Sequence, residues 1–93
     1  MIRDLGDRVE VSGSMTLPDA AKLFEAGNAL LGRAGVVFDL QAVSQIDSSG
    51  LAVLFGWERT ARRNGNTIRI VNPPQTLLSL ADVYGVGDML PLA

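Results

Sequence analysis

The segment that most constrains the fold is the short run between Gly35 and Leu40, in which only Asp39 interrupts the apolar side chains. A run of this length with so little alternation is typical of a strand that is buried on both faces. Such a strand needs other strands beside it and helices packed against it. The sequence must supply both from 93 residues, which is enough for one core and one domain.

Strands and helices are expected to alternate along the rest of the sequence. Alternating apolar and polar side chains predict strands at 8–12 and 67–71, the first of them ending at Gly13 and its flanking serines. Residues 41–47 are interpreted as a polar connection. Helices are expected at 16–31, 49–63 and 72–84, followed by a short helical turn in 86–93. This order predicts a small α/β sheet layered with helices.

The ends of the expected helices carry ordinary start and stop signals. Thr16 is expected to cap the first helix, with Asp19 three residues later in the capping-box position. Gly65 suits the left-handed position that ends the second helix. On the third helix, Tyr84 is expected to pack its ring and to leave its hydroxyl in water.

The start of the second helix carries the most informative motif, Asp47-Ser48-Ser49-Gly50. A helix N-terminus has unpaired backbone N–H groups and a positive dipole end, so it favours an oxygen or a phosphate. Two interpretations of the serine hydroxyls remain. They cap the helix, a role for which Asp47 is equally suited, or Ser48 is a site that a partner protein contacts.

The second helix is predicted to have two distinct sides. One side should pack on the sheet, with Gly50 allowing close approach; it contains Leu51, Leu54, Trp57 and Ala61, with Val53 at its margin. The other side should face outward; it contains Ser48, Ala52, Phe55, Arg59 and Arg62. An outward-facing aromatic between small residues and arginines has the composition of an interface centre.

The composition excludes several classes of function. The chain has no cysteine and no histidine, so disulfides, thiolate nucleophiles and Cys/His zinc sites are absent. The ten carboxylates are scattered. Asp39 and Asp47 are expected near strand or loop ends, where they can approach each other, but local capping is favoured over catalysis. We therefore expect no catalytic residues, no metal site and no cofactor.

The charge pattern also limits the partners. The net charge is −2 and no segment is dominated by basic residues, which argues against nucleic-acid binding. Charged residues interrupt the sequence too often for a membrane span, and the first residues lack a secretory hydrophobic region. A cytoplasmic protein without direct membrane insertion is expected.

Several segments together resemble a STAS domain, the family named after sulphate transporters and anti-sigma factor antagonists. They are the strand at 36–39, the motif at 46–51, and the helix, strand and Pro-led helix that follow. The resemblance covers nearly the whole chain. It implies one STAS-type α/β domain over residues 1–93, with a roughly four-stranded mixed sheet covered by three to four helices.

Two branches of the family are similar to this chain. One is the small cytoplasmic STAS subunit of Mla-type ABC transporters of phospholipid, which maintain outer-membrane lipid asymmetry. This branch implies a non-enzymatic protein bound to the ATPase subunit and, through it, to the permease and membrane complex at the inner membrane. The other branch is the anti-sigma factor antagonist, whose partner kinase phosphorylates the hydroxyl directly after the motif aspartate, here Ser48.

One departure favours the transporter branch. Antagonists usually carry Gly-Glu-Leu-Asp after the first alternating strand, whereas residues 13–17 of this chain contain no acidic residue. The ATPase is therefore the expected partner, and phosphorylation of Ser48 is the alternative. The expected contact residues are Ser48, Ser49, Ala52, Phe55, Arg59 and Arg62.

Overall fold

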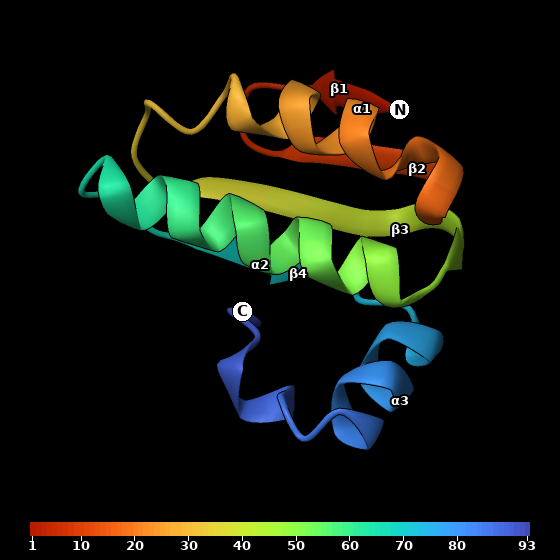
Figure 1. Ribbon diagram of the computed structural model, residues 1–93. Coiled ribbons are helices and arrows are strands. Elements are labelled where there is room, and N and C mark those ends of the chain that lie inside the picture. The colour runs from red at the N-terminus through yellow and green to blue at the C-terminus, as the bar shows by residue number, and fades with distance from the viewer.

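In the computed structural model, which describes residues 1–93, four strands form one sheet in the order β1-β2-β3-β4 (Figure 1). The strands are β1 (Ile2–Asp4), β2 (Val9–Met15), β3 (Val36–Ile46) and β4 (Ile68–Val71). Strand β1 is antiparallel to β2, whereas β2, β3 and β4 are parallel. The helices are α1 (Leu17–Asn28), α2 (Ser48–Arg63) and α3 (Gln75–Val83), with a 3-10 turn η1 (Gly87–Met89). The predicted mixed sheet of four strands is confirmed.

Two strands are longer than the hydrophobic pattern predicted, and the sheet contains one strand more. Strand β3 continues through the segment expected to be a polar connection, and β2 continues past the glycine expected to end it. The two strands pair in parallel as far as Met15 and Ile46, with irregular register on either side of Ser12. Pairing of the backbone therefore overrides the polar composition of residues 41–45. Strand β1, which the sequence did not predict, is a three-residue edge strand.

The core lies between the sheet and the two long helices. Val9, Phe38 and Ile70 are aligned across β2, β3 and β4, and all three are buried. The indole of Trp57 on α2 stacks on the Phe38 ring, with 4.2 Å between ring centroids and an interplanar angle of 11°. Its Nε1 donates a hydrogen bond of 3.1 Å to the backbone oxygen of Phe24 on α1. The prediction that Trp57 belongs to the core is confirmed.

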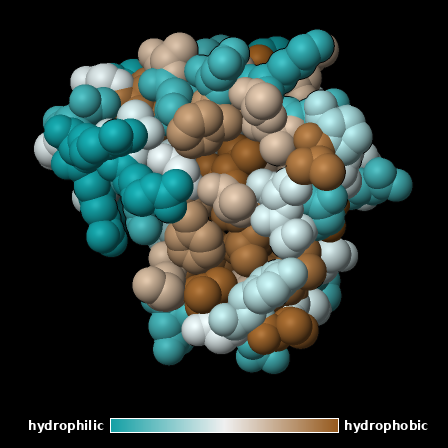
Figure 2. Space-filling model, viewed as in Figure 1, coloured by the Kyte–Doolittle hydropathy of each residue, from teal (hydrophilic) through white to brown (hydrophobic).

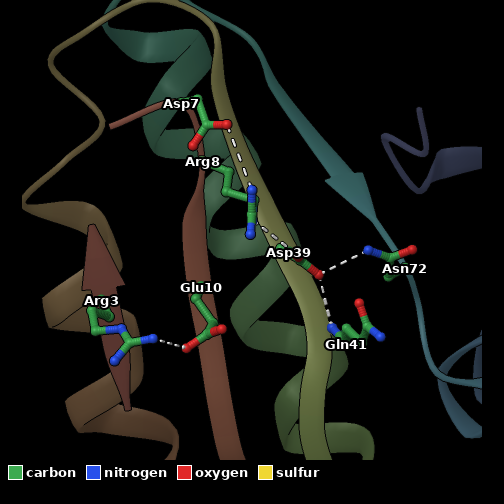
Figure 3. A network of polar contacts seen from close by, with 7 residues as sticks. All are labelled: Arg3, Asp7, Arg8, Glu10, Asp39, Gln41 and Asn72. Carbon is green, nitrogen blue, oxygen red and sulfur yellow. Dashed lines mark hydrogen bonds and ion pairs between the residues drawn. The ribbon is translucent and has the colours of Figure 1, made fainter. Parts of the chain in front are cut away.

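The opposite face of the sheet is polar. Asp39, on β3, accepts hydrogen bonds from the Gln41 backbone N–H (3.0 Å) and the Asn72 side-chain amide (3.1 Å), and pairs with Arg8 Nε at 3.1 Å. Figure 3 shows this network in front of the strands, with helices behind them. The Gln41 N–H, then the Asn72 amide and the Arg8 cation, hold the pKa of the Asp39 carboxyl below its ordinary value. Asp39 is itself buried, so this run of β3 is shielded on both faces as expected, but polar rather than apolar side chains shield the second face.

Two glycines bring α1 and α2 close together. A Cβ atom on Gly27 would lie 2.3 Å from the Trp57 ring, and one on Gly56 would lie 2.4 Å from the Phe24 ring. Helix α1 ends at Asn28, three residues earlier than expected. Gly65 follows Asn64, the C-cap residue of α2, and adopts a φ of 74°, which confirms its predicted role.

Candidate partner-binding surface

Asp47 joins the N-termini of α1 and α2. Its Oδ1 accepts hydrogen bonds from the backbone N–H groups of Ser49 (2.8 Å) and Gly50 (3.4 Å), at the start of α2. Its Oδ2 accepts one from the backbone N–H of Leu17 (3.2 Å), the first residue of α1. One carboxylate therefore satisfies unpaired donors of two helices.

The expected caps at both helices have to be corrected. The Thr16 side chain makes no capping bond to α1, and its hydroxyl instead pairs with the Ser14 hydroxyl at 2.7 Å. The serines do not cap α2 either, because Asp47 takes that role. Ser48 is exposed and Ser49 is half-buried, so the Ser48 hydroxyl projects from the helix start toward solvent.

Gly50 fixes the depth at which α2 meets the sheet. A Cβ atom at this position would lie 2.4 Å from the backbone oxygen of Met15 and 2.6 Å from the Ile46 side chain. The predicted close approach of α2 at Gly50 is therefore confirmed. The whole motif, Asp47 to Gly50, sits where β2 and β3 end.

The predicted division of α2 into two sides agrees with the structure. The inner side is buried; it contains Gly50, Leu51, Val53, Leu54, Trp57 and Ala61. Of the outer residues, Ser48, Ala52, Arg59 and Arg62 are exposed. Phe55 is half-buried, because part of its ring packs against the core while the rest lines an open groove.

That groove lies between α2 and the residues after α3. Its first part is lined by Ser48, Leu51, Ala52, Phe55, Tyr84 and Val86. Its second part is lined by Ala52, Phe55, Glu58, Arg59, Arg62, Val86 and Met89. Because the two parts share Ala52, Phe55 and Val86, they form one continuous depression, which we call the α2 groove.

The far wall of the α2 groove was not predicted. Tyr84 is 57% exposed and Met89 is 63% exposed, so the expectation that the Tyr84 ring packs in the fold is wrong. We call Tyr84, Val86 and Met89 the C-terminal wall. The sequence did carry one sign of this wall. Several apolar side chains follow α3 in a short segment, and such a segment cannot bury all of them.

Hydrophobic and charged side chains are separated along this surface. Figure 2 shows a brown and tan strip running down the middle of the molecule, and teal side chains at the left, where α2 ends. On the α1 side of the strip, a shallow hollow is lined by Ala20, Ala21, Phe24, Ser49, Ala52 and Val53. At the other end, Arg62 pairs with Glu58 at 3.6 Å, while Arg59 has no ion-pair partner.

The two aspartates singled out in the sequence are far apart. Asp39 lies in the middle of β3 and Asp47 directly follows its last residue. They are eight positions apart along extended chain, which corresponds to about 26 Å, so the expected approach of the two carboxylates is wrong. None of the helices is long and apolar enough to span a membrane.

A parallel β2-β3-β4 sheet, two helices on one face and an Asp-Ser-Ser-Gly motif at the start of α2 define a STAS-type domain. The chain belongs to the STAS family: the family model described as "Mlab, STAS domain" matches residues 2–91.

Two relatives represent the two branches considered above. The chain is 38% identical over 55 residues to the intermembrane phospholipid transport system binding protein MlaB of Haemophilus influenzae, covering 59% of this chain and 52% of that protein. It is 30% identical over 54 residues to the anti-sigma-B factor antagonist of Bacillus subtilis, covering 58% of this chain and 50% of that protein. The matches therefore span about half the length of each relative.

Solved structures support the fold. The unphosphorylated anti-sigma factor antagonist SpoIIAA superposes with a TM-score of 0.75 at 14% identity, covering all of this chain and 86% of that one. Its phosphorylated form gives a TM-score of 0.71, also at 14% identity, with coverage of 100% and 89%. At this identity, the likeness concerns the arrangement of the strands and helices.

Proposed function

We propose that this protein is a non-enzymatic STAS subunit that binds the cytoplasmic ATPase of a phospholipid ABC transporter and stabilises or regulates it. The protein would be held at the inner membrane by this partner, in a complex that maintains outer-membrane lipid asymmetry. Its mechanism is contact: a subunit that binds one arrangement of the ATPase more tightly shifts the population toward that arrangement.

The observation that carries the proposal is the outer side of α2. There, the exposed Ser48 and Ala52 lead to the half-open Phe55 ring and then to Arg59 and Arg62. Aromatic and arginine side chains are enriched at the centres of protein interfaces, and small neighbours allow a partner to approach closely. The name of the Haemophilus relative, a phospholipid transport system binding protein, points to the class of partner.

Phe55→Ala is expected to weaken binding to the ATPase subunit of the cognate transporter by about 30-fold, as for a hot-spot residue worth about 2 kcal/mol. The fold should persist, because part of the Phe55 ring lies outside the core. Affinity would be measured by titration of the purified subunits, and folding by circular dichroism and urea unfolding.

Val37→Ala is the matched control. Val37 is also half-buried, but it lies on β3 between core residues and therefore points to the polar face of the sheet. This substitution should leave the affinity unchanged. An ATPase that bound Phe55→Ala as tightly as the unaltered protein would remove Phe55 from the interface.

The second candidate function is an anti-sigma factor antagonist switched by phosphorylation of Ser48. It is supported by the 30% identical Bacillus relative and by the exposure of the Ser48 hydroxyl beside the N-terminus of α2. A phosphate there would gain from the helix dipole but would face the Asp47 carboxylate.

The switch predicts a mass increase of about 80 Da, one phosphoryl group, after incubation with a co-encoded anti-sigma factor kinase and ATP. The increase should be absent from Ser48→Ala and retained by Ser49→Ala. Unchanged intact mass with an active kinase would exclude this function. A neighbouring sigma factor and kinase gene would favour it, and neighbouring ATPase and permease genes would favour the transporter.

A further inference from the structure

The α2 groove is long enough to hold a helix of a partner protein. Its floor and near wall run along α2 from Ser48 to Arg62, and its far wall is the C-terminal wall. Fourteen residues of helix extend about 21 Å, so the groove matches a partner helix of about four turns. An amphipathic helix laid in an apolar groove is a recurrent mode of peptide recognition.

The lining of the groove changes in character along its length. Near Ser48 the lining is almost entirely apolar, with Leu51, Phe55 and Val86 around Ala52. Near the end of α2 it contains two arginines and one carboxylate. That carboxylate, Glu58, is half-buried and already lies 3.6 Å from Arg62, which leaves Arg59 exposed and without an ion-pair partner.

We propose that the α2 groove receives an amphipathic helix of the ATPase, with apolar side chains on the C-terminal wall and a carboxylate near one end that pairs with Arg59. This inference rests on the proposed function. It adds that the partner also contacts the C-terminal wall and that the partner segment carries a negative charge. A carboxylate is required because it complements the cationic end of the groove.

A second copy of this chain fits the groove less well. In a two-fold symmetric contact, the same surface is presented by both copies. The only carboxylate in the lining is Glu58, which is already paired, so the copy would bring no free acidic side chain from this surface to Arg59. The second copy would also bring its own Arg59 and Arg62, and like charges in one interface repel each other.

Two substitutions test the proposal through binding to the purified ATPase subunit. Arg59→Glu and Met89→Glu should each weaken binding at least 10-fold, the first by reversing a charge and the second by placing a charge on the apolar wall. Arg69→Glu and Val83→Glu are the matched controls and should bind normally. Arg69 is an exposed arginine on β4, and Val83 is 79% exposed on α3 but does not line the groove.

The partner segment is identified by hydrogen exchange on the ATPase with and without this protein. The proposal expects protection of a helix with apolar residues at helical spacing and an Asp or Glu near one end. Replacing that acid with arginine should restore binding to Arg59→Glu. Protection of an extended or basic segment would overturn the proposal.

Failure of the inference can be distinguished from failure of the proposed function. If Phe55→Ala loses affinity while Arg59→Glu and Met89→Glu bind normally, the ATPase still docks on α2, but it neither contacts the C-terminal wall nor places a carboxylate on Arg59, and the inference is overturned while the proposed function stands. If the unaltered protein does not bind the ATPase, the proposed function fails as well. A dimer of the isolated chain that Met89→Glu dissociates in analytical ultracentrifugation would assign the groove to a second copy and overturn the proposal.

Discussion

Gly50→Ala is expected to lower the free energy of unfolding by about 3 kcal/mol, the upper end of the usual cost of overpacking. The added methyl would lie 2.4 Å from the backbone oxygen of Met15, and a backbone atom at the end of β2 has little room to move. In a chain of 93 residues, whose total stability is on the order of 5–15 kcal/mol, this loss is large. The midpoint of thermal unfolding should fall by roughly 15 °C.

Two other glycines provide controls for this effect. Gly32→Ala adds a methyl where nothing lies within 4 Å, and should change stability by less than about 0.5 kcal/mol. Gly56→Ala would meet the edge of the Phe24 ring, which is a side chain and half-buried, so its cost should be intermediate. Urea unfolding of the three variants measures the order of their stabilities. Equal stability of Gly50→Ala and Gly32→Ala would contradict the close approach of α2 to the sheet.

The same substitution should also weaken partner binding. Gly50, the motif serines and Phe55 all belong to α2, so a displacement of this helix moves its outer side relative to the C-terminal wall. Gly50→Ala is therefore expected to lose affinity for the ATPase even at temperatures where it remains folded.

The two sides of α2 could be predicted from the sequence because they depend only on the helical period. The positions of Trp57 and Gly50 on the inner side follow from that period, as does the outward direction of Arg59. The extents of β2 and β3 could not be predicted, since polar residues such as Gln45 are held in a strand by pairing with distant residues.

The candidate surface was predicted only as far as α2 itself defines it. The C-terminal wall depends on where the chain returns after α3, which local patterns do not determine. Tyr84 lies about 30 residues from the α2 residues beside it in the groove. The hydrogen bond from Leu17 to Asp47 likewise joins residues 30 positions apart. The sequence motif identified Asp47 as a possible cap of α2. Its second role, as a cap of α1, follows only from the tertiary arrangement.

Because Asp47 serves two helices, Asp47→Ala should lower the free energy of unfolding by about 2–3 kcal/mol, more than the roughly 1 kcal/mol of an ordinary cap. The substitution leaves the N–H groups of Leu17 and Ser49 without an acceptor, whereas the Gly50 N–H keeps its 3.0 Å hydrogen bond to the backbone oxygen of residue 47. Urea unfolding measures the total loss, and amide hydrogen exchange locates it at the first turns of α1 and α2.

Asp47→Asn separates the two caps. The amide oxygen can still accept from Ser49, but the NH₂ group then faces the Leu17 N–H, donor against donor. Exchange protection should therefore fall at Leu17 and persist at Ser49. Asp19→Asn is the control, because Asp19 also lies in the first turn of α1 but makes no capping hydrogen bond. If Asp47→Asn kept protection at Leu17, the carboxylate would not be what connects α1 to α2, and the position of the exposed Ser48 would depend on packing alone.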